Sequence, residues 1–323
     1  MATAHELHPP SSILHPHPIF IAGPTAVGKS AVALALADKL CGELISVDSM
    51  QVYRGLDIGT AKPSAAERTR VPHHLIDVAE LTEPFDAAKF VTLAQQAVAE
   101  IQSRGRVPIF CGGTGLYFKA FLDGLGEAPP SDERLRAELE ATPFAALLRE
   151  LEQRDPPTFS RIDRQNPRRV IRAVEVIRLT GKPFSEQRAA WSKAADAQEA
   201  ESSRCDDQTA QRAVPTLVVL SRSSPDLHGR INTRVDEMFA QGLVNETRRL
   251  LKLGLAQNKT AMQAIGYRQV VEHLRGERAL PETIELVKSK TRQFAKRQGT
   301  WFHRQMKARW IELQPGSSLT DIW

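Results

Sequence analysis

The sequence predicts an α/β fold with a parallel sheet core, a helical insertion and a helical C-terminal part. Two observations indicate this class of fold. In the first third of the chain, short apolar runs alternate with helix-like segments, and a long stretch without strand-like runs follows. Such alternation is typical of parallel sheets, because neighbouring parallel strands need crossover connections that are usually helices.

The elements follow one another in a clear order. The expected strands are Ile19 to Ala22, Glu43 to Val47, Val107 to Phe110 and Leu217 to Leu220. A helix is expected directly after the first strand, over Ala31 to Leu40. The gap before the last strand is too long for one crossover, so Gly126 to Ala213 is interpreted as an insertion.

The insertion and the C-terminal part both look helical. In the insertion we expect helices over Asp132 to Arg154, with a break at Pro143, and over Pro167 to Thr180, then a polar stretch from Lys193 to Arg212. After the last strand, helices are expected from Ser224 to about Trp310. The predicted organisation is a loose tail over residues 1–18, a core formed by residues 19–125 and 214–323, and an insertion over residues 126–213.

The composition excludes several classes of protein. Of 323 residues, 25% are charged and 41% are hydrophobic, which argues against a disordered chain, and no apolar run is long enough to span a membrane. The first 18 residues lack the pattern of a signal peptide. Cys41, Cys111 and Cys205 have neither metal-site spacing nor a disulfide framework. We therefore expect a cytoplasmic protein without membrane contact.

The most informative motif is a glycine-rich loop between the first strand and the first helix. In such a loop, backbone N–H groups surround phosphate oxygens, the helix N-terminus adds its positive dipole and a lysine adds a full charge. The loop consists of Gly23, Pro24, Thr25, Ala26, Val27, Gly28, Lys29 and Ser30. The sequence therefore predicts a P-loop that binds a diphosphate or triphosphate. The motif leaves the reaction open, because the same loop serves kinases, NTPases and enzymes that expel a diphosphate.

Polar residues also follow the next two strands. Asp48 comes directly after the second strand, where open α/β sheets hold their ligands. Three roles remain open for it: a helix cap, a Mg²⁺ ligand or a general base. The third strand runs into Gly112-Gly113-Thr114-Gly115-Leu116-Tyr117, whose glycines allow the backbone to approach a ligand closely.

A basic segment near the C-terminus indicates a polyanionic partner. The net charge is only +5, but Lys288 to Arg309 contains many basic residues and no acidic one. Lys288, Arg292 and Lys296 share one stripe of the expected helix, and an apolar face is expected from Ile284, Val287, Thr291 and Phe294. A merely solvated charged face is the alternative, although such a face usually mixes both signs.

Several of these motifs resemble the tRNA dimethylallyltransferase family, the bacterial tRNA isopentenyltransferases. The similar segments are GPTAVGKS from Gly23, DSMQVYRGLDIGTAKP from Asp48, PHHLID from Pro72, GGTGLY from Gly112, AMQAIGYRQ from Ala261 and KTRQFAKRQGTWF from Lys290. They occur in the family's order across nearly the whole chain. The second segment is the most specific, because ordinary P-loop kinases do not share it.

The resemblance implies a reaction and its participants. A dimethylallyl group would pass from dimethylallyl diphosphate to N6 of adenosine 37 in tRNAs that read codons beginning with U. The diphosphate would bind the P-loop, with Mg²⁺ near Ser30 and with Arg230 as a further ligand, although pairing of Arg230 with Asp226 or Glu237 is an alternative. Asp48 would be the base, and Thr114 would position the amine or the base. A monomer is expected, and nucleotide binding stays open.

The resemblance also implies the residues that contact tRNA. Adenosine 37 must leave its stack to reach the donor, and Ser49, Met50 and Gln51 would line its pocket. The insertion would hold the anticodon stem and loop. The further expected contacts are Arg136, Arg168, Arg169, Val170, Ile171, Arg172, Lys290, Arg292, Lys296 and Arg297. For each arginine of the insertion alone, a solvated or packing role is the alternative.

Some residues are expected to have structural roles. Asn166 and Pro167 predict the start of a helix, where the family usually has Asn-Asp and this chain has Gln165-Asn166. His73 and His74 are interpreted as packed residues, and core packing is favoured over base stacking for Trp301 and Phe302. Two other functions remain possible: a P-loop kinase or small NTPase with Asp48 on magnesium, and a tRNA-binding protein without chemistry.

Overall fold

The expected parallel sheet forms the centre of the larger part of the chain. A computed structural model describes residues 16–126, 128–187 and 217–314, so most of the tail expected over 1–18, the polar stretch 193–212 and Cys205 lie outside it. The chain divides into two compact units, residues 1–117 with 213–323 and residues 118–212. The second unit begins at residue 118, earlier than the start predicted at residue 126, and it ends at residue 212, next to the predicted end at residue 213.

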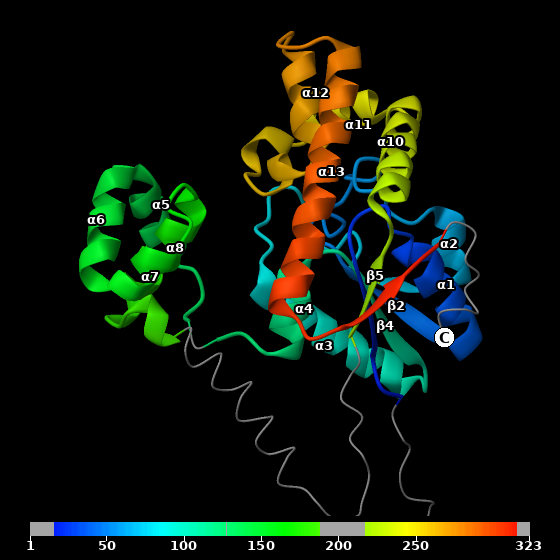
Figure 1. Ribbon diagram of the computed structural model, residues 1–323, viewed down its shortest axis with the longest axis horizontal. Coiled ribbons are helices and arrows are strands. Elements are labelled where there is room, and N and C mark those ends of the chain that lie inside the picture. The colour runs from blue at the N-terminus through cyan, green and yellow to red at the C-terminus, as the bar shows by residue number, and fades with distance from the viewer. Residues whose placement is uncertain (1–15, 127, 188–216, 315–323) are drawn as a thin grey trace, which may run out of the picture. The chain divides into compact units, whose positions relative to one another are not determined.

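The first unit contains one six-stranded sheet in which all pairings are parallel (Figure 1). Its spatial order is β3-β2-β4-β1-β5-β6. The strands are β1 (Ile19–Ala22), β2 (Gly42–Val47), β3 (His73–His74), β4 (Val107–Gly112), β5 (Leu217–Ser221) and β6 (Arg309–Glu312). The four predicted strands are confirmed, and the short edge strands β3 and β6 were missed.

Helices pack on both sides of this sheet because consecutive strand residues, which face opposite sides, are apolar. Ile21, Ile109 and Val218 share a buried cluster with residues of α1 (Lys29–Leu40). Phe20 and Phe110, one residue away on each strand, must face the other side, where their rings stack at 4.8 Å. There α3 (Ala87–Ser103) packs against β2 and β4. The sheet therefore has a buried apolar face on each side.

The remaining helices of the first unit follow β2 and β5. They are α2 (Ala65–Arg70), α10 (Ser224–Ala240), α11 (Leu243–Lys252), α12 (Tyr267–Leu274) and α13 (Leu280–Gln305), with 3₁₀ turns η1 (Leu255–Gln257) and η2 (Ala261–Gln263). The prediction of helix up to about Trp310 is wrong at its end. α13 stops at Gln305, and β6 adds to the sheet edge while Trp310 stacks on His303. None of the described helices has the length and apolar character needed to cross a membrane.

The second unit is a small helical cluster, entered through α4 (Gly115–Leu122). It contains α5 (Glu133–Ala141), α6 (Phe144–Arg154), α7 (Pro156–Arg161) and α8 (Pro167–Thr180). The predicted break at Pro143 and the predicted limits of the last helix are confirmed. As expected, Asn166 caps that helix, because its Oδ1 accepts a hydrogen bond from the N–H of Arg169 at 3.4 Å.

A buried carboxylate ties this unit together. Glu175 on α8 is fully buried, accepts hydrogen bonds from the Ser131 hydroxyl at 2.7 Å and the Asp132 N–H at 3.2 Å, and pairs with Arg136 and Arg172. Although burial raises the pKa of Glu175, these partners hold it below its ordinary value. The carboxylate is therefore charged and satisfied, and it connects α5 to α8.

Replacing Glu175 should destabilise the second unit. In Glu175→Ala, Arg136 and Arg172 lose their common partner, and we expect a loss of about 3 kcal/mol in the free energy of unfolding. The measurement is urea unfolding with limited proteolysis of residues 118–187. Arg169→Ala, at an exposed position on the same helix, is the control and should leave the unfolding midpoint unchanged. Equal unfolding curves for both variants would contradict a structural role of Glu175.

Candidate active site

The glycine-rich loop after β1 has the geometry of an anion cradle. Gly23 has a φ of 148°, and a Cβ at this position would lie 2.6 Å from the carbonyl oxygen of Leu220. Ala26 and Gly28 also have positive φ, and Gly28 directly precedes α1. The loop thus turns tightly and aims the helix N-terminus into the space beside it, as the sequence predicted.

Cationic side chains hold the carbonyl groups of this loop. Lys29 Nζ donates to the Pro24 carbonyl at 2.7 Å, and Arg230 Nε donates to the Ala26 carbonyl at 2.9 Å. Arg222 Nε donates to the Val27 carbonyl at 2.7 Å. These contacts place Arg230 on the loop, and Asp226, its proposed alternative partner, pairs with Arg222 at 2.8 Å.

The cradle opens into a pocket of about 960 Å³. Its walls include Lys29, Arg230 and Arg234, and the side chain of Ser30 is exposed beside it. Burial lowers the pKa of Lys29 to about 8, although the charge of Asp48 opposes this shift. Burial likewise lowers the pKa of Arg234. A site with several partly desolvated cations favours a multiply charged anion.

Asp48 lies where the sequence predicted it, at the carboxyl end of β2. Its Oδ1 accepts hydrogen bonds from the N–H groups of Met50 at 2.8 Å and Gln51 at 3.3 Å, so it stabilises a turn. No helix starts there, which excludes the helix-cap role. Oδ2 has no hydrogen-bond partner among the described residues, and the residue is half-buried. One carboxylate oxygen is therefore fixed while the other is available to a substrate.

The loop after β4 lies between Asp48 and the cradle, since β4 separates β2 from β1 in the sheet. Thr114 Oγ1 accepts a hydrogen bond from the Ser49 N–H at 3.1 Å, and the Thr114 N–H donates to the Val47 carbonyl at 3.1 Å. Thr114 is thus fixed beside Asp48. A Cβ at Gly112 would lie 2.1 Å from the Val47 carbonyl oxygen, so this loop depends on its glycines.

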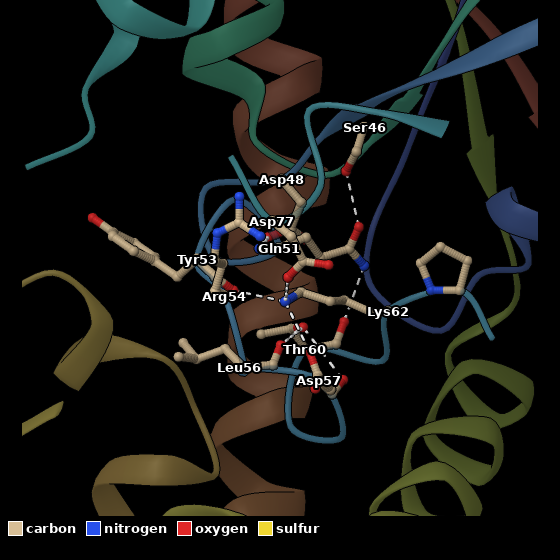
Figure 2. A network of polar contacts seen from close by, with 12 residues as sticks. Ser46, Asp48, Gln51, Tyr53, Arg54, Leu56, Asp57, Thr60, Lys62 and Asp77 are labelled. Carbon is tan, nitrogen blue, oxygen red and sulfur yellow. Dashed lines mark hydrogen bonds and ion pairs between the residues drawn. The ribbon is translucent and has the colours of Figure 1, made fainter. Parts of the chain in front are cut away.

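A charged network that sequence analysis missed supports the segment after Asp48 (Figure 2). The Lys62 side chain is 2% exposed, and its Nζ contacts the Tyr53 carbonyl at 2.6 Å, Asp57 at 2.9 Å and Asp77 at 2.5 Å. Burial raises the pKa of Asp77, but Lys62 and Arg68 hold it below its ordinary value. Lys62 and Asp77 are 15 residues apart, and no sequence pattern links them.

Gln51, which the sequence placed in the acceptor pocket, also belongs to this network. Its Oε1 accepts a hydrogen bond from Ser46 Oγ at 2.8 Å, and its Nε2 donates to the Thr60 carbonyl at 3.1 Å. The amide therefore holds the 48–62 segment against the sheet. Contact of Gln51 with tRNA remains a prediction, and Ser49 and Met50, both half-buried, remain candidates for the pocket wall.

The residues interpreted as structural are packed. His74 Nε2 contacts Glu43 at 2.7 Å, and His73 Nδ1 contacts the Val71 carbonyl at 2.7 Å. The described residues hold no group of three or more His, Cys, Asp or Glu suited to a metal ion. Phe302 is fully buried, and the Trp301 ring occupies the space where a Cβ at Gly115 would lie. Core packing is therefore confirmed for Phe302, and Trp301 is half-buried with its ring against Gly115.

The expected tRNA contacts of the second unit fall into three groups. Val170 is fully buried in its core and Ile171 packs against that core, so a side-chain contact of Val170 with tRNA is wrong. Arg136 and Arg172 form ion pairs with Glu175, as described above. Arg168 and Arg169 are exposed on α8 and remain candidates.

On α13, some residues of the predicted basic segment contact α10 and others are exposed. Lys288 pairs with Asp236 of α10 at 2.8 Å, and Arg292 donates to Asn232 Oδ1 at 2.6 Å. Lys290, Lys296 and Arg297 are exposed and have no ion pair among the described residues. The Arg297 guanidinium lies over the ring of Phe294, 5.8 Å from its centre, and Phe294 is 38% exposed. These residues form a basic and aromatic surface, and Lys288 and Arg292 are not part of it.

Comparison with known proteins assigns this arrangement to a family. A family model described as IPP transferase matches residues 51–305. The chain belongs to the IPP transferase family. The tRNA dimethylallyltransferase 1 of Trichlorobacter lovleyi is 44% identical over 309 residues, covering 94% of this chain and 96% of the relative. The tRNA dimethylallyltransferase of Geobacillus kaustophilus is 46% identical over 298 residues, covering 91% of this chain and 89% of the relative.

Solved structures of this IPP transferase family are also similar. The tRNA isopentenylpyrophosphate transferase of Bacillus halodurans is 37% identical with a TM-score of 0.65, covering 95% of this chain and 94% of that one. A eukaryotic dimethylallyltransferase acting on tRNA is 27% identical with a TM-score of 0.70, covering 92% of this chain and 74% of that one. The comparisons confirm the resemblance that the motifs indicated.

Diphosphate binding should weaken above pH 8. Lys29 has a pKa of about 8, and only its protonated form adds a charge to the cradle. We expect the Kd for inorganic diphosphate to rise from pH 7 to 9.5, measured by calorimetry. Lys29→Arg stays charged over this range and is the control, since ionisation of the ligand itself affects both proteins equally. Parallel pH profiles for the two proteins would contradict the assignment to Lys29.

Proposed function

We propose that this protein transfers a dimethylallyl group from dimethylallyl diphosphate to N6 of adenosine 37 in tRNAs that read codons beginning with U. The products are N6-isopentenyladenosine and diphosphate. Membership of the IPP transferase family supports prenyl transfer to tRNA. The observation that carries the mechanism is the position of Asp48 and the anion cradle at the same edge of the sheet, with the Thr114 loop between them.

The donor binds through its diphosphate. The cradle amides, Lys29 and Arg230 stabilise the negative charge that grows as the bond between the allylic carbon and oxygen breaks. The departing diphosphate keeps the electron pair of that bond. In this reaction the P-loop stabilises the diphosphate as a leaving group. No phosphorus atom is attacked.

A Mg²⁺ ion bound with the donor would supply further charge stabilisation of the diphosphate. Among the described residues, the exposed hydroxyl of Ser30 is a suitable ligand, and Mg²⁺ commonly keeps several waters and takes substrate oxygens as its other ligands. The residues present therefore fit a metal that arrives with the diphosphate, and they do not form a separate metal site.

The acceptor amine is activated by Asp48. The lone pair of N6 is shared with the purine ring, so the amine must lose a proton as its bond to the allylic carbon forms. Oδ2 of Asp48 accepts this proton, while Oδ1 stays fixed by the turn. Thr114, fixed by Ser49, positions the amine. Extrusion of the adenosine from the anticodon loop precedes this step.

The sheet order shows how Asp48 lies relative to the P-loop strand. In P-loop NTPases an acidic residue and the P-loop hydroxyl hold the metal together. Here the strands beside β1 end in Gly112 and Ser221, and neither brings a carboxylate. Asp48 is two strands away from β1, roughly 10 Å at ordinary strand spacing. This distance suits a base that acts on the far end of a five-carbon group.

Binding of tRNA is assigned to two surfaces, each described within its own unit. One contains Lys290, Lys296 and Arg297 of α13, and the other contains Arg168 and Arg169 of α8. Both expose positive charge that attracts the phosphate backbone. We also propose that the protein acts as a monomer in the cytoplasm, where tRNA is modified.

A direct assay tests the proposal. The purified protein is incubated with labelled dimethylallyl diphosphate, Mg²⁺ and total tRNA, and the tRNA is digested to nucleosides. Label in N6-isopentenyladenosine supports the proposal, and mapping of the modified tRNAs tests position 37. Consumption of ATP without a prenyl donor would support a kinase or NTPase, and tRNA binding without transfer would support a binding protein.

Replacing Asp48 should separate chemistry from binding. Asp48→Asn keeps an oxygen for the turn but removes the base, so we expect the transfer rate to fall by about 100-fold or more. The tRNA Kd, measured by filter binding, should change by less than about threefold, because the turn is retained. An equal loss of rate and of tRNA affinity would argue against a base.

Replacing basic residues of α13 should weaken tRNA binding through the phosphates. For Lys290→Ala and Arg297→Ala we expect weaker binding and a salt dependence reduced by about one counterion each, with donor affinity unchanged. The control is Lys252→Ala on α11, another exposed lysine without an ion pair among the described residues. An unchanged salt dependence, or a loss of donor affinity instead, would contradict this assignment.

A further inference from the structure

A buried glutamine connects the donor cradle to the loop that holds Thr114. Gln298 lies on α13 and is 8% exposed. Its Oε1 accepts a hydrogen bond from the Thr25 N–H at 2.9 Å, and its Nε2 donates to the Gly113 carbonyl at 2.8 Å. One partner is a donor and the other an acceptor, so the orientation of the amide is determined. Both ends of the side chain are thus used.

These two hydrogen bonds of Gln298, called the Gln298 bridge below, link the proposed donor site to the proposed acceptor site. Thr25 belongs to the cradle after β1, and Gly113 precedes Thr114 in the loop after β4. Thr114 in turn accepts a hydrogen bond from the residue next to Asp48. An unbroken series of hydrogen bonds and covalent links therefore runs from the donor site to the acceptor site, and α13 contributes Gln298 to it.

The space around the bridge is built for this amide. A Cβ at Gly113 would lie 2.3 Å from Gln298 Nε2, which is closer than any real contact, so the loop approaches the glutamine as closely as glycine allows. The Thr25 N–H already donates to Gln298, so this amide is occupied by the bridge.

We infer that Gln298 is a positioning residue for prenyl transfer, which fixes the distance between the cradle and the Thr114 loop. This inference rests on the proposed function. Displacement at the allylic carbon requires the amine nitrogen to lie about 3–3.5 Å from that carbon, on the side opposite the leaving diphosphate. Misplacement by 1 Å can cost about 100-fold in rate. Gln298 touches neither substrate and acts through the two loops.

The test compares two buried glutamines. In Gln298→Ala we expect the single-turnover rate, with donor and tRNA both saturating, to fall by about 10- to 100-fold. The Kd values for donor and tRNA should change by less than about threefold, because the groups that bind them remain. Gln269→Ala is the control: Gln269 is also 8% exposed, but its Oε1 accepts a hydrogen bond from the Gly266 N–H at the start of α12.

The outcomes are distinct. A rate loss in Gln298→Ala that is absent in Gln269→Ala at a similar thermal midpoint supports positioning. An unchanged rate, or equal losses in both variants, overturns it, as does a loss confined to donor or tRNA affinity. If the wild-type protein transfers no prenyl group to tRNA, the proposed function fails; if the wild type is active and Gln298→Ala equals it, only this inference fails.

A substitution at Gly113 tests the Gln298 amide from the loop that it contacts. In Gly113→Ala the new methyl group must displace Gln298 Nε2, so we expect a similar loss of single-turnover rate. In the double variant Gln298→Ala with Gly113→Ala, the amide is already absent, and the nearest remaining atom is the Gly23 carbonyl oxygen, 3.3 Å from the new Cβ. The double variant should therefore be no slower than the slower single variant. Losses that multiply would show that Gly113 acts independently of Gln298 and would overturn the bridge.

Discussion

A P-loop binds an anion through its backbone N–H groups, so its carbonyl oxygens must be held away from the anion. The rest of this structure depends on the side chains that hold those carbonyl groups. Lys29, Arg222 and Arg230 each donate to a different carbonyl of the loop. The loop is therefore held in shape by cations that also supply the positive field for a diphosphate. Arg222 directly follows β5 and Arg230 lies on α10, so the cradle depends on chain segments about 200 residues away.

Much of the fold could be predicted from the sequence because its signals are local. The four apolar strands, the break at Pro143 and the cap formed by Asn166 all follow from residues within one turn or one strand. β3 and β6 were missed because neither contains an apolar run: β3 is the pair His73–His74, and β6 begins with Arg309 and ends with Glu312. Their pairing is determined by neighbours in space, which periodicity does not report.

Prediction of the site succeeded for geometry that motifs encode and failed for charges whose partners are distant in sequence. The absence of acids between Lys288 and Arg309 suggested a continuous basic stripe, but Asp236 of α10 pairs with Lys288. Similarly, Glu175 on α8 takes up Arg136 from α5. Whether an arginine or lysine is available to RNA depends on such pairs. The positions of Asp48 and Thr114 could be predicted because Asp48 directly follows β2 and Thr114 lies two residues after β4, and their roles stay predictions.

The loop after β4 depends on its glycines because other parts of the chain approach it closely. In the proposed function this loop lies between the donor site and the acceptor site, and a side chain at one of its glycines would displace the residues that support it. Close contacts confirm this at Gly112 with the Val47 carbonyl, at Gly113 with Gln298 and at Gly115 with Trp301. Each glycine therefore meets a different neighbour, and Thr114 alone presents a functional group. In the proposed function, a loop with so few side chains lets the donor and acceptor sites lie close together, and Gln298 of α13 links this loop to the cradle.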